Sequence, residues 1–292
     1  MPPELNTMYL KHYNLKEHPF GATPDPRFLF LSNTHKEAMA ALAYGVQTGR
    51  GFVLLTANPG MGKTTLLFNL LGNLKNVART AFMFQTQCSS REFLLELMAD
   101  LDIAGGEDTI ITHRELRRAL ILEAQAKRSV VVVVDEAQNL DDSVLETIRL
   151  LSDYETPTTK LLQIVLSGQP ELMERIRLPH LTNLRQRVSI VTRLDRLSVP
   201  ETHAYIRHRL KVAGHIGPPV FTLEACDLIA QLGQGIPRNI NTLCFNALSA
   251  GFAAGVNPIP PAIIEEAEKE SLFSQTVAAT SPTEDPFQRA RH

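Results

Sequence analysis

The segment from Gly51 to Leu71, GFVLLTANPGMGKTTLLFNLL, constrains the fold more than any other part of the chain. It begins with an apolar run typical of a buried strand and ends with apolar side chains repeated at helical spacing. Between them lies a loop ending in Gly62, Lys63 and Thr64, the pattern of a loop that holds phosphate groups between a strand and a helix. We therefore predict that the chain binds a nucleoside triphosphate.

The predicted phosphate loop supplies three kinds of contact. Successive backbone N–H groups, backed by the positive end of the following helix, suit phosphate oxygens. Lys63 can reach the β- and γ-phosphates, and the Thr64 hydroxyl can hold Mg²⁺. The expected nucleotide-binding residues are Asn58, Pro59, Gly60, Met61, Gly62, Lys63, Thr64 and Thr65. Ala57 stands where this pattern usually has its first glycine, and alanine fits the turn only if its φ angle stays negative.

A second motif, VVVVVDE from Val130 to Glu136, predicts the catalytic half of the same site. An apolar run without alternation is expected of a strand buried on both faces. Asp135, at the end of that strand, could orient the Mg²⁺ shell, and Glu136 could polarise the attacking water. Because a phosphate loop precedes this pair of carboxylates, we predict that the chain hydrolyses ATP.

The segment QIVLSGQP, from Gln163 to Pro170, predicts another strand that ends in polar side chains. In a five-stranded sheet of this type, we expect that strand to lie between the strands of the first two motifs. Ser167 or Gln169 could then reach the γ-phosphate or the attacking water. The sequence does not decide between them, and either could simply begin a loop.

Three arginines lie where they could meet phosphate charge. Arg185 and Arg187 precede the last predicted strand, at a sheet edge from which an arginine would reach a neighbouring subunit's nucleotide more easily than its own. The sequence does not choose between these two, and surface ion pairs with residues such as Asp195 are the alternative. Arg238, in GIPRNINTL, is expected in the first turn of a helix, where a cation is disfavoured unless an anion is near. It could touch the γ-phosphate from a lid.

Composition limits the classes of protein to which the chain could belong. A length of 292 residues with 44% hydrophobic residues fits about two globular domains, and a net charge of −2 argues against nucleic-acid binding over the whole surface. Three scattered cysteines provide no disulfide framework and no paired-cysteine metal site, as in a cytosolic protein. No apolar run approaches the roughly 18 residues that span a bilayer. We expect a cytoplasmic location, with any attachment to the inner membrane made through partners.

Strand and helix patterns alternate up to Leu197 and only helical patterns follow. Strands are predicted at 51–56, 80–84, 129–134, 160–167 and 188–194, and helices at 63–74, 90–101, 113–126 and 141–151. This alternation predicts an α/β fold with a five-stranded, mostly parallel sheet and flanking helices. A capping box at Ser198–Glu201 opens a helix to about Val212, and helices are also predicted at 223–232 and after Pro237.

These patterns predict four regions along the chain. Residues 1–50 form an N-terminal segment with a first helix, and residues 51–197 form the α/β nucleotide-binding core. Residues 198–256 form a small all-α lid domain. Residues 257–292 form a C-terminal extension whose tail, rich in Ser, Thr, Pro and charge, is expected to be disordered.

Taken in order, these motifs resemble those of the AAA+ ATPases. ANPGMGKT, VVVVDE, LRQR and GIPRNIN correspond to Walker A, Walker B, arginine finger and sensor 2. LRQRVSIV is similar to its counterpart in the RuvB motor and in clamp loaders, and GIPRNI to sensor 2 of the initiator ATPases. Within the superfamily, the chain resembles the ExeA/GspA-type secretion ATPases, including those linked to exosortase and exopolysaccharide loci. Met8–Leu10, Pro19–Phe20, Thr23–Phe30, DEAQNL at 135–140 and SGQPEL at 167–172 carry this likeness, which covers about residues 8–255.

The resemblance implies a P-loop fold with a helical lid, ATP and Mg²⁺ as cofactors, and self-assembly into a hexameric ring or a filament. It also implies that residues 9–30 fold over the adenine. Longer family members carry a transmembrane segment and a peptidoglycan-binding region after the ATPase, which this sequence lacks, so direct anchoring is not expected.

Two functions compete once ATPase chemistry is granted. The favoured one is a motor for secretion or for envelope and exopolysaccharide assembly, acting on protein partners. The alternative is a DNA-binding ATPase switch that regulates transposition, because the core is also similar to the TniB/TnsC ATPases. Two basic clusters could bind DNA or form solvated helix faces; they comprise Arg114, Arg117 and Arg118, and Arg207, Arg209 and Lys211.

Overall fold

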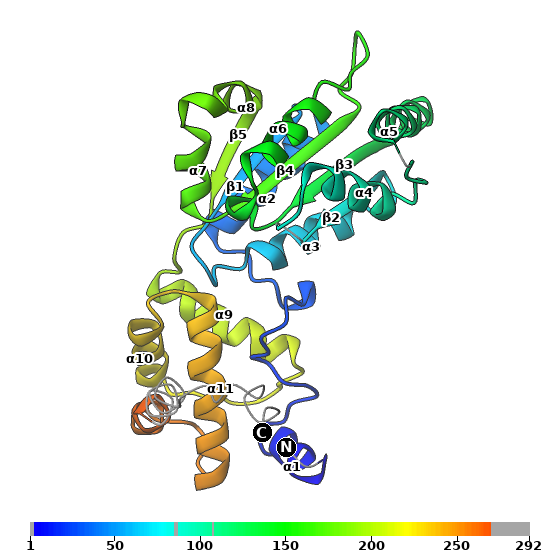
Figure 1. Ribbon diagram of the computed structural model, residues 1–292. Coiled ribbons are helices and arrows are strands. Elements are labelled where there is room, and N and C mark those ends of the chain that lie inside the picture. Colours follow the sequence, from blue (N-terminus) through cyan, green and yellow to red (C-terminus); the bar gives the residue numbers. More distant parts are fainter. Residues whose placement is uncertain (1–2, 85–86, 107, 270–292) are drawn as a thin grey trace, which may run out of the picture. The chain divides into compact units, whose positions relative to one another are not determined.

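The computed structural model describes residues 3–84, 87–106 and 108–269. Contacts divide the chain into two compact units (Figure 1). The α/β unit runs from Thr23 to Arg196, and the helical unit combines the described residues up to Ala22 with those from Leu197 onward. The predicted disordered tail lies largely outside the described residues.

The α/β unit is built on one five-stranded parallel sheet, as the sequence predicted. Its strands are β1 (Phe52–Thr56), β2 (Ala78–Met83), β3 (Ser129–Val134), β4 (Leu162–Gly168) and β5 (Val188–Arg193). The strand order is β2-β3-β4-β1-β5, so β4 lies between β1 and β3, and β5 forms the edge beside β1. The carboxyl ends of β1, β3 and β4 therefore meet at one edge of the sheet.

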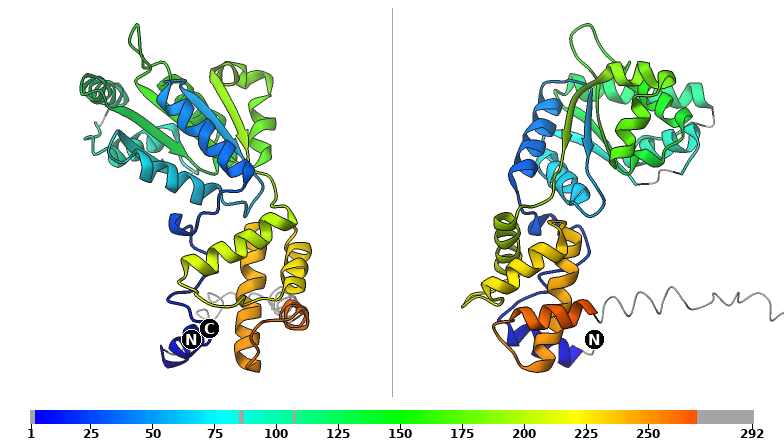
Figure 2. Two further views of the ribbon diagram at one scale, coloured as in Figure 1. Left: turned by 180° about the vertical axis from the view of Figure 1, so that it is seen from behind. Right: turned by 90° about the vertical axis from the view of Figure 1, so that its left-hand side faces the viewer.

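Helices cover both faces of the sheet (Figure 2). One face is covered by α2 (Asn33–Gln47) and α3 (Lys63–Leu74); the other is covered by α4 (Ser90–Asp100), α5 (Thr109–Gln125), α6 (Asp142–Leu151), α7 (Pro170–Ile176) and α8 (Thr182–Arg187). Phe52 and Leu54 of β1 belong to the hydrophobic core under the second group. Val53 points the other way, toward α2, which approaches so closely that a Cβ on Gly45 would lie 2.4 Å from Val53 Cγ2. Burial on both faces explains why these strands are almost wholly apolar.

Element boundaries differ from the predicted ones mainly where capping decides them. α5 begins at Thr109 rather than at 113, because the Asp108 side chain accepts a hydrogen bond from the backbone N–H of Ile110 and caps the helix there. Three single turns add to the unit: η1 (Pro26–Phe28), η2 (Ala137–Asn139) and η3 (Pro179–Leu181). Together with the short helices α7 and α8, these turns were not predicted.

The helical unit contains α1 (Pro3–His12), α9 (Val199–Val212), α10 (Leu223–Gly233), α11 (Pro237–Ala254) and a further helix over 261–269. Both hydrogen bonds of the predicted Ser198–Glu201 capping box open α9. The N-terminal segment packs within this unit, because the Tyr13 hydroxyl donates to the carbonyl oxygen of Leu248 at 2.8 Å. The first described residues therefore group with the helices after 197, although the sequence had placed them in a segment of their own.

Two further observations concern the chain as a whole. Burial raises the pKa of Cys88, Cys226 and Cys244, that of Cys226 to about 11, which keeps these thiols protonated at neutral pH. Within the part of the chain that the structure describes, no helix is long and apolar enough to cross a bilayer.

Candidate nucleotide site

The loop between β1 and α3 has the conformation that its glycines allow. Gly60 and Gly62 have φ angles of 79° and 88°, in the left-handed region that side chains disfavour. Among the described non-glycine residues, positive φ angles occur at Asn14, Asp102, Lys127, Glu136 and Gln234. Ala57 is not one of them, so it meets the condition under which alanine can replace glycine. Its N–H donates to the carbonyl oxygen of Gly168 at 3.1 Å, which joins the loop to the end of β4.

A buried histidine supports the loop from α2. His35 Nε2 lies 3.1 Å from the carbonyl oxygen of Met61, and His35 Nδ1 lies 2.7 Å from Ser32 Oγ. Because a carbonyl only accepts, Nε2 carries the proton and Nδ1 accepts from the Ser32 hydroxyl. His35 was not predicted as a site residue, and a lone histidine in a helical pattern carries no signal for this role.

Asp135 is the buried centre of the site, with 3% of its surface exposed. Its Oδ2 accepts a hydrogen bond of 2.7 Å from the Thr64 hydroxyl. Its Oδ1 accepts one of 2.7 Å from the Ser167 hydroxyl and one of 3.0 Å from the N–H of Glu136. Three donors thus hold the Asp135 carboxylate beside the first turn of α3. The hydroxyl and carboxylate oxygens of Thr64 and Asp135 are the ligand type that Mg²⁺ prefers, so the residues present fit that ion.

Glu136 lies between the phosphate loop and the end of β4. Its Oε1 is 3.8 Å from Lys63 Nζ, which also donates to the carbonyl oxygen of Ala57 at 3.3 Å. Its Oε2 accepts from Gln138 Nε2 at 2.6 Å and from Gln169 Nε2 at 3.5 Å. Glu136 has φ 51° and ψ 35°, a left-handed conformation that costs about 1 to 2 kcal/mol in a residue with a side chain.

The two sensor candidates therefore have different neighbours. Ser167 is fully buried and contacts Asp135, whereas Gln169 is partly exposed and contacts Glu136. Gln138, which bridges Glu136 and Gln169, was not predicted, although it stands within the DEAQNL motif. Walker A, Walker B and the end of β4 thus converge as the strand order requires.

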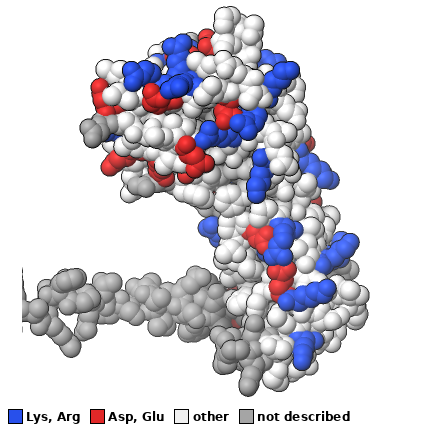
Figure 3. Space-filling view, turned by 90° about the vertical axis from the view of Figure 1, so that its right-hand side faces the viewer, with Lys and Arg blue, Asp and Glu red and all other residues white. Residues whose placement is uncertain are grey.

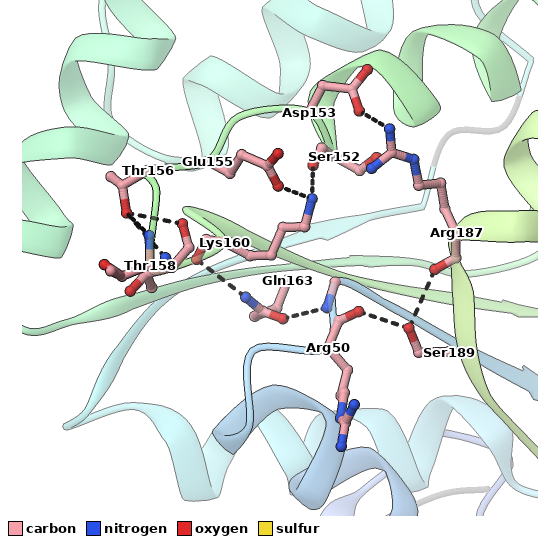
Figure 4. A network of polar contacts seen from close by, with 12 residues as sticks. Arg50, Ser152, Asp153, Glu155, Thr156, Thr158, Lys160, Gln163, Arg187 and Ser189 are labelled. Carbon is pink, nitrogen blue, oxygen red and sulfur yellow. Dashed lines mark hydrogen bonds and ion pairs between the residues drawn. The ribbon is translucent and has the colours of Figure 1, made fainter.

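The two finger candidates lie at the opposite end of the sheet. Val188 is opposite Phe52, the first residue of β1, whereas the phosphate loop follows Thr56 at the last residue of β1. Arg187 Nη2 is 2.6 Å from Asp153 Oδ1, and Figure 4 shows its guanidinium turned toward that carboxylate. Arg185, two residues earlier in α8, is exposed.

The other arginines that the sequence named as candidates lie in both units. Arg238 is exposed in the first turn of α11, in the helical unit, and its contact with the γ-phosphate stays a prediction. Arg209 is buried and donates to the carbonyl oxygen of Pro19 at 2.5 Å, which removes it from the second basic cluster. Arg114 and Arg118 are exposed and pair with Glu115. Figure 3 shows basic and acidic side chains intermixed over that view of the α/β unit.

Comparisons with known proteins agree with this geometry. Residues 46–176 match the family described as AAA domain. The chain is 41% identical over 254 residues to general secretion pathway protein A of Aeromonas hydrophila, a match covering 86% of this chain and 46% of that protein. The chain therefore spans about half the length of this relative.

Two solved structures share the fold at low sequence identity. Cdc6p from Pyrobaculum aerophilum superposes with a TM-score of 0.67 at 17% identity, covering 90% of this chain and 74% of that one. Drosophila ORC bound to DNA gives a TM-score of 0.67 at 17% identity, covering 93% and 68%. At these identities, the likeness establishes the fold alone.

Fold, phosphate loop and paired carboxylates together define a P-loop ATPase of the AAA+ class. The identity with general secretion pathway protein A extends over most of this chain. Within the AAA+ class, the chain therefore resembles the ExeA/GspA-type ATPases.

Proposed function

We propose that this ATPase hydrolyses Mg-ATP within a homo-oligomer and uses the resulting conformational change for secretion or for envelope and exopolysaccharide assembly. The observation that carries the chemical part is the 3.8 Å approach of Lys63 Nζ to Glu136 Oε1, which joins the phosphate loop to a candidate base. The pathway is suggested by the name of the relative, general secretion pathway protein A.

Different residues would bind the phosphates and the metal ion. Backbone N–H groups along Asn58–Thr65 and the start of α3 would receive the phosphates, with Lys63 on the β- and γ-phosphates. Thr64 and Asp135 would hold Mg²⁺, which supplies charge neutralisation at the phosphate oxygens when bound. Ser167 would keep Asp135 oriented through the hydrogen bond between them.

Glu136 would polarise the attacking water. The water oxygen forms a bond to the γ-phosphorus while the bond from that phosphorus to the bridging oxygen breaks, leaving ADP and inorganic phosphate. Glu136 accepts a proton from the water and returns it to the products, so the carboxylate is regenerated. Gln169 lies within 3.5 Å of Glu136 and would sense the γ-phosphate from the end of β4.

An arginine from a neighbouring subunit would complete the charge stabilisation, because Arg185 and Arg187 lie at the end of the sheet away from their own phosphate loop. We also propose that Arg238 contacts the γ-phosphate. Partners would be further copies of this chain and secretion or envelope-assembly proteins, met in the cytoplasm where ATP is supplied. The likeness to ORC concerns fold alone and lends DNA binding no support of its own.

Replacing Glu136 by glutamine tests the proposed chemistry. Glu136→Gln should bind ATP with unchanged affinity but hydrolyse it about 10² to 10⁴ times more slowly, because the water loses its base while the phosphate contacts remain. ATP affinity is measured by equilibrium binding and turnover by phosphate release. The matched control is Glu171→Gln, at an exposed position in the first turn of α7, which should leave both quantities unchanged. Wild-type turnover in Glu136→Gln would contradict the assignment.

A further inference from the structure

The side chain of Gln138 connects two parts of the site that are far apart in sequence. Its Nε2 donates to Glu136 Oε2 at 2.6 Å, and its Oε1 accepts from the backbone N–H of Gln169 at 3.0 Å. A carboxylate only accepts and a backbone N–H only donates, so these two partners fix which way the amide points. A rotated amide would set its oxygen against the carboxylate oxygen and its NH₂ group against the N–H.

The backbone that carries Gln138 is held as firmly as its side chain. Gln138 lies in η2, and its own carbonyl oxygen accepts from Arg175 Nη1 at 2.6 Å. The same nitrogen donates to the carbonyl oxygen of Leu140 at 2.7 Å. Arg175 thus ties the middle of the turn and the residue just after it to α7. Gln138 is therefore presented to Glu136 by a turn that has little freedom to move.

Gly168 gives the Gln138 amide room to reach the end of β4. A Cβ at this position would lie 2.7 Å from Gln138 Oε1 and 2.8 Å from Leu172 Cδ2. Such distances are too short for a side chain, so any other residue would displace the amide. Gly168, in the SGQPEL motif, therefore leaves the space that the Gln138 amide occupies.

The Gln138 hydrogen bond to the Glu136 carboxylate is shorter than the contacts that Lys63 and Gln169 make with it. Its side chain is 42% exposed, and the cation of Lys63 attracts Oε1 from 3.8 Å. Gln169 Nε2, at 3.5 Å, lies at the outer limit of a hydrogen bond. The 2.6 Å contact from Gln138 is the short hydrogen bond on the opposite oxygen.

We propose that Gln138 is a positioning residue that holds the Glu136 carboxylate in the orientation needed to polarise the attacking water. The inference rests on the function proposed above, in which Glu136 is the base. In this role Gln138 acts through Glu136. Its bond to the Gln169 backbone couples that orientation to the end of β4.

The test replaces Gln138 by methionine, which keeps the length of the side chain and removes both hydrogen bonds. In the full chain, Gln138→Met should lower kcat about 10- to 100-fold, since a small misplacement of a catalytic group has effects of that size. KM and the equilibrium affinity for ATP should stay within twofold. In the Glu136→Gln background, the same substitution should cause no further loss, because the carboxylate on which Gln138 acts is gone.

Gln163→Met is the matched control. The Gln163 amide also makes two hydrogen bonds, in its case both to backbone groups: it accepts from the Gly51 N–H at 2.8 Å and donates to the carbonyl oxygen of Lys160 at 3.4 Å, at the opposite end of β4 (Figure 4). This variant should lower the melting temperature and leave kcat unchanged. A kcat for Gln138→Met within twofold of wild type would overturn the proposal, as would an equal further loss in the Glu136→Gln background.

Two outcomes separate the inference from the function on which it rests. Full activity in Glu136→Gln would refute the base itself, whereas an inactive Glu136→Gln beside a fully active Gln138→Met would refute only the positioning role. If Gln138→Met unfolds, Gln138→Ala is measured instead. A loss of ATP affinity that matches its loss of kcat/KM would then mean that Gln138 builds the phosphate loop, and the proposal would be wrong.

Discussion

His35 illustrates how a single residue outside the phosphate loop can set its shape. Met61 lies between the two glycines with positive φ angles, and its carbonyl oxygen is turned away from the loop to meet His35 Nε2. A carbonyl fixed in this way keeps the neighbouring N–H groups free to face an anion. The site thus depends on a side chain that we place outside direct nucleotide contact.

Replacing His35 by alanine should therefore weaken nucleotide binding. Without the ring, the carbonyl of Met61 and the hydroxyl of Ser32 lose a buried partner, and the loop is free to rotate that carbonyl inward. We expect ATP affinity to fall about tenfold, equivalent to about 1.4 kcal/mol, as measured with a fluorescent ATP analogue. The control is His113→Ala, which removes a histidine hydrogen-bonded to Tyr154 between α5 and the turn after α6. Equal affinities in both variants would mean that His35 serves stability alone.

At the scale of residues, some members of the candidate site could be predicted from the sequence and others could not. The sequence predicts roles for Lys63, Thr64, Asp135 and Glu136 because these residues lie in short contiguous motifs. His35 and Gln138 were not predictable, since His35 meets Met61 26 residues away and Gln138 meets Gln169 31 residues away. Only the folded arrangement of α2, η2 and β4 reveals such pairs.

At the scale of elements, the strands were the most predictable part of the fold. Their doubly buried, apolar character gives a pattern that few other structures share, and β3 has the bounds predicted from its valines. The short helices α7 and α8 span fewer than the two turns over which helical periodicity becomes readable. The packing of the N-terminal segment with the helical unit depends on long-range contacts such as that of Tyr13 with Leu248, which no local pattern encodes.

Arg175 joins three elements, and its removal should destabilise the turn that follows β3. Arg175 Nη1 donates to the carbonyl oxygens of Gln138, in η2, and of Leu140, directly after it. Arg175 Nη2 forms an ion pair at 2.5 Å with Asp142, in the first turn of α6. Arg175→Ala should lower the free energy of unfolding by about 1 to 3 kcal/mol, because the carbonyls lose a charged donor. Denaturant titration measures this change, with Arg177→Ala, at an exposed site just after α7, as the control.

Part of this stabilisation should depend on pH. The hydrogen bond from Arg175 holds the pKa of the Asp142 carboxyl below its usual value, with His180 contributing less. A lowered pKa means that the ionised form stabilises the fold above the ordinary carboxyl pKa and that this contribution disappears as pH falls through the lowered value. The stability difference between wild type and Arg175→Ala should therefore be larger at pH 7 than at strongly acidic pH. A difference that is constant across this range would assign the whole effect to the carbonyl contacts.

For the whole molecule, the position of the finger candidates predicts that activity depends on assembly. Arg185 and Arg187 lie beside the start of β1, whereas the phosphate loop follows its end, so one subunit does not bring them to its own phosphates. The salt bridge of Arg187 with Asp153 offers a purely structural explanation for that residue. Asp153→Asn separates the two explanations, because it removes the ion pair and keeps the arginine.

Arg187→Ala should therefore abolish turnover while leaving ATP affinity intact, and Asp153→Asn should retain turnover. An arginine finger contributes about 10³ to 10⁵ in rate, so the difference is large enough for a phosphate-release assay. Wild-type specific activity should also rise with protein concentration. Arg185→Ala, measured in parallel, shows which arginine carries the effect.

A mixture of two inactive variants tests whether the arginine acts from a neighbouring subunit. Lys63→Ala subunits lack ATP binding but keep their arginines, and Arg187→Ala subunits bind ATP but lack the finger. At an interface where the arginine of the first faces the nucleotide of the second, one intact site is rebuilt, so the mixture should recover part of the wild-type activity. Sedimentation of the mixture must demonstrate co-assembly. Co-assembled but inactive mixtures, together with full activity in both single arginine variants, would mean that each chain hydrolyses ATP without a neighbour's arginine.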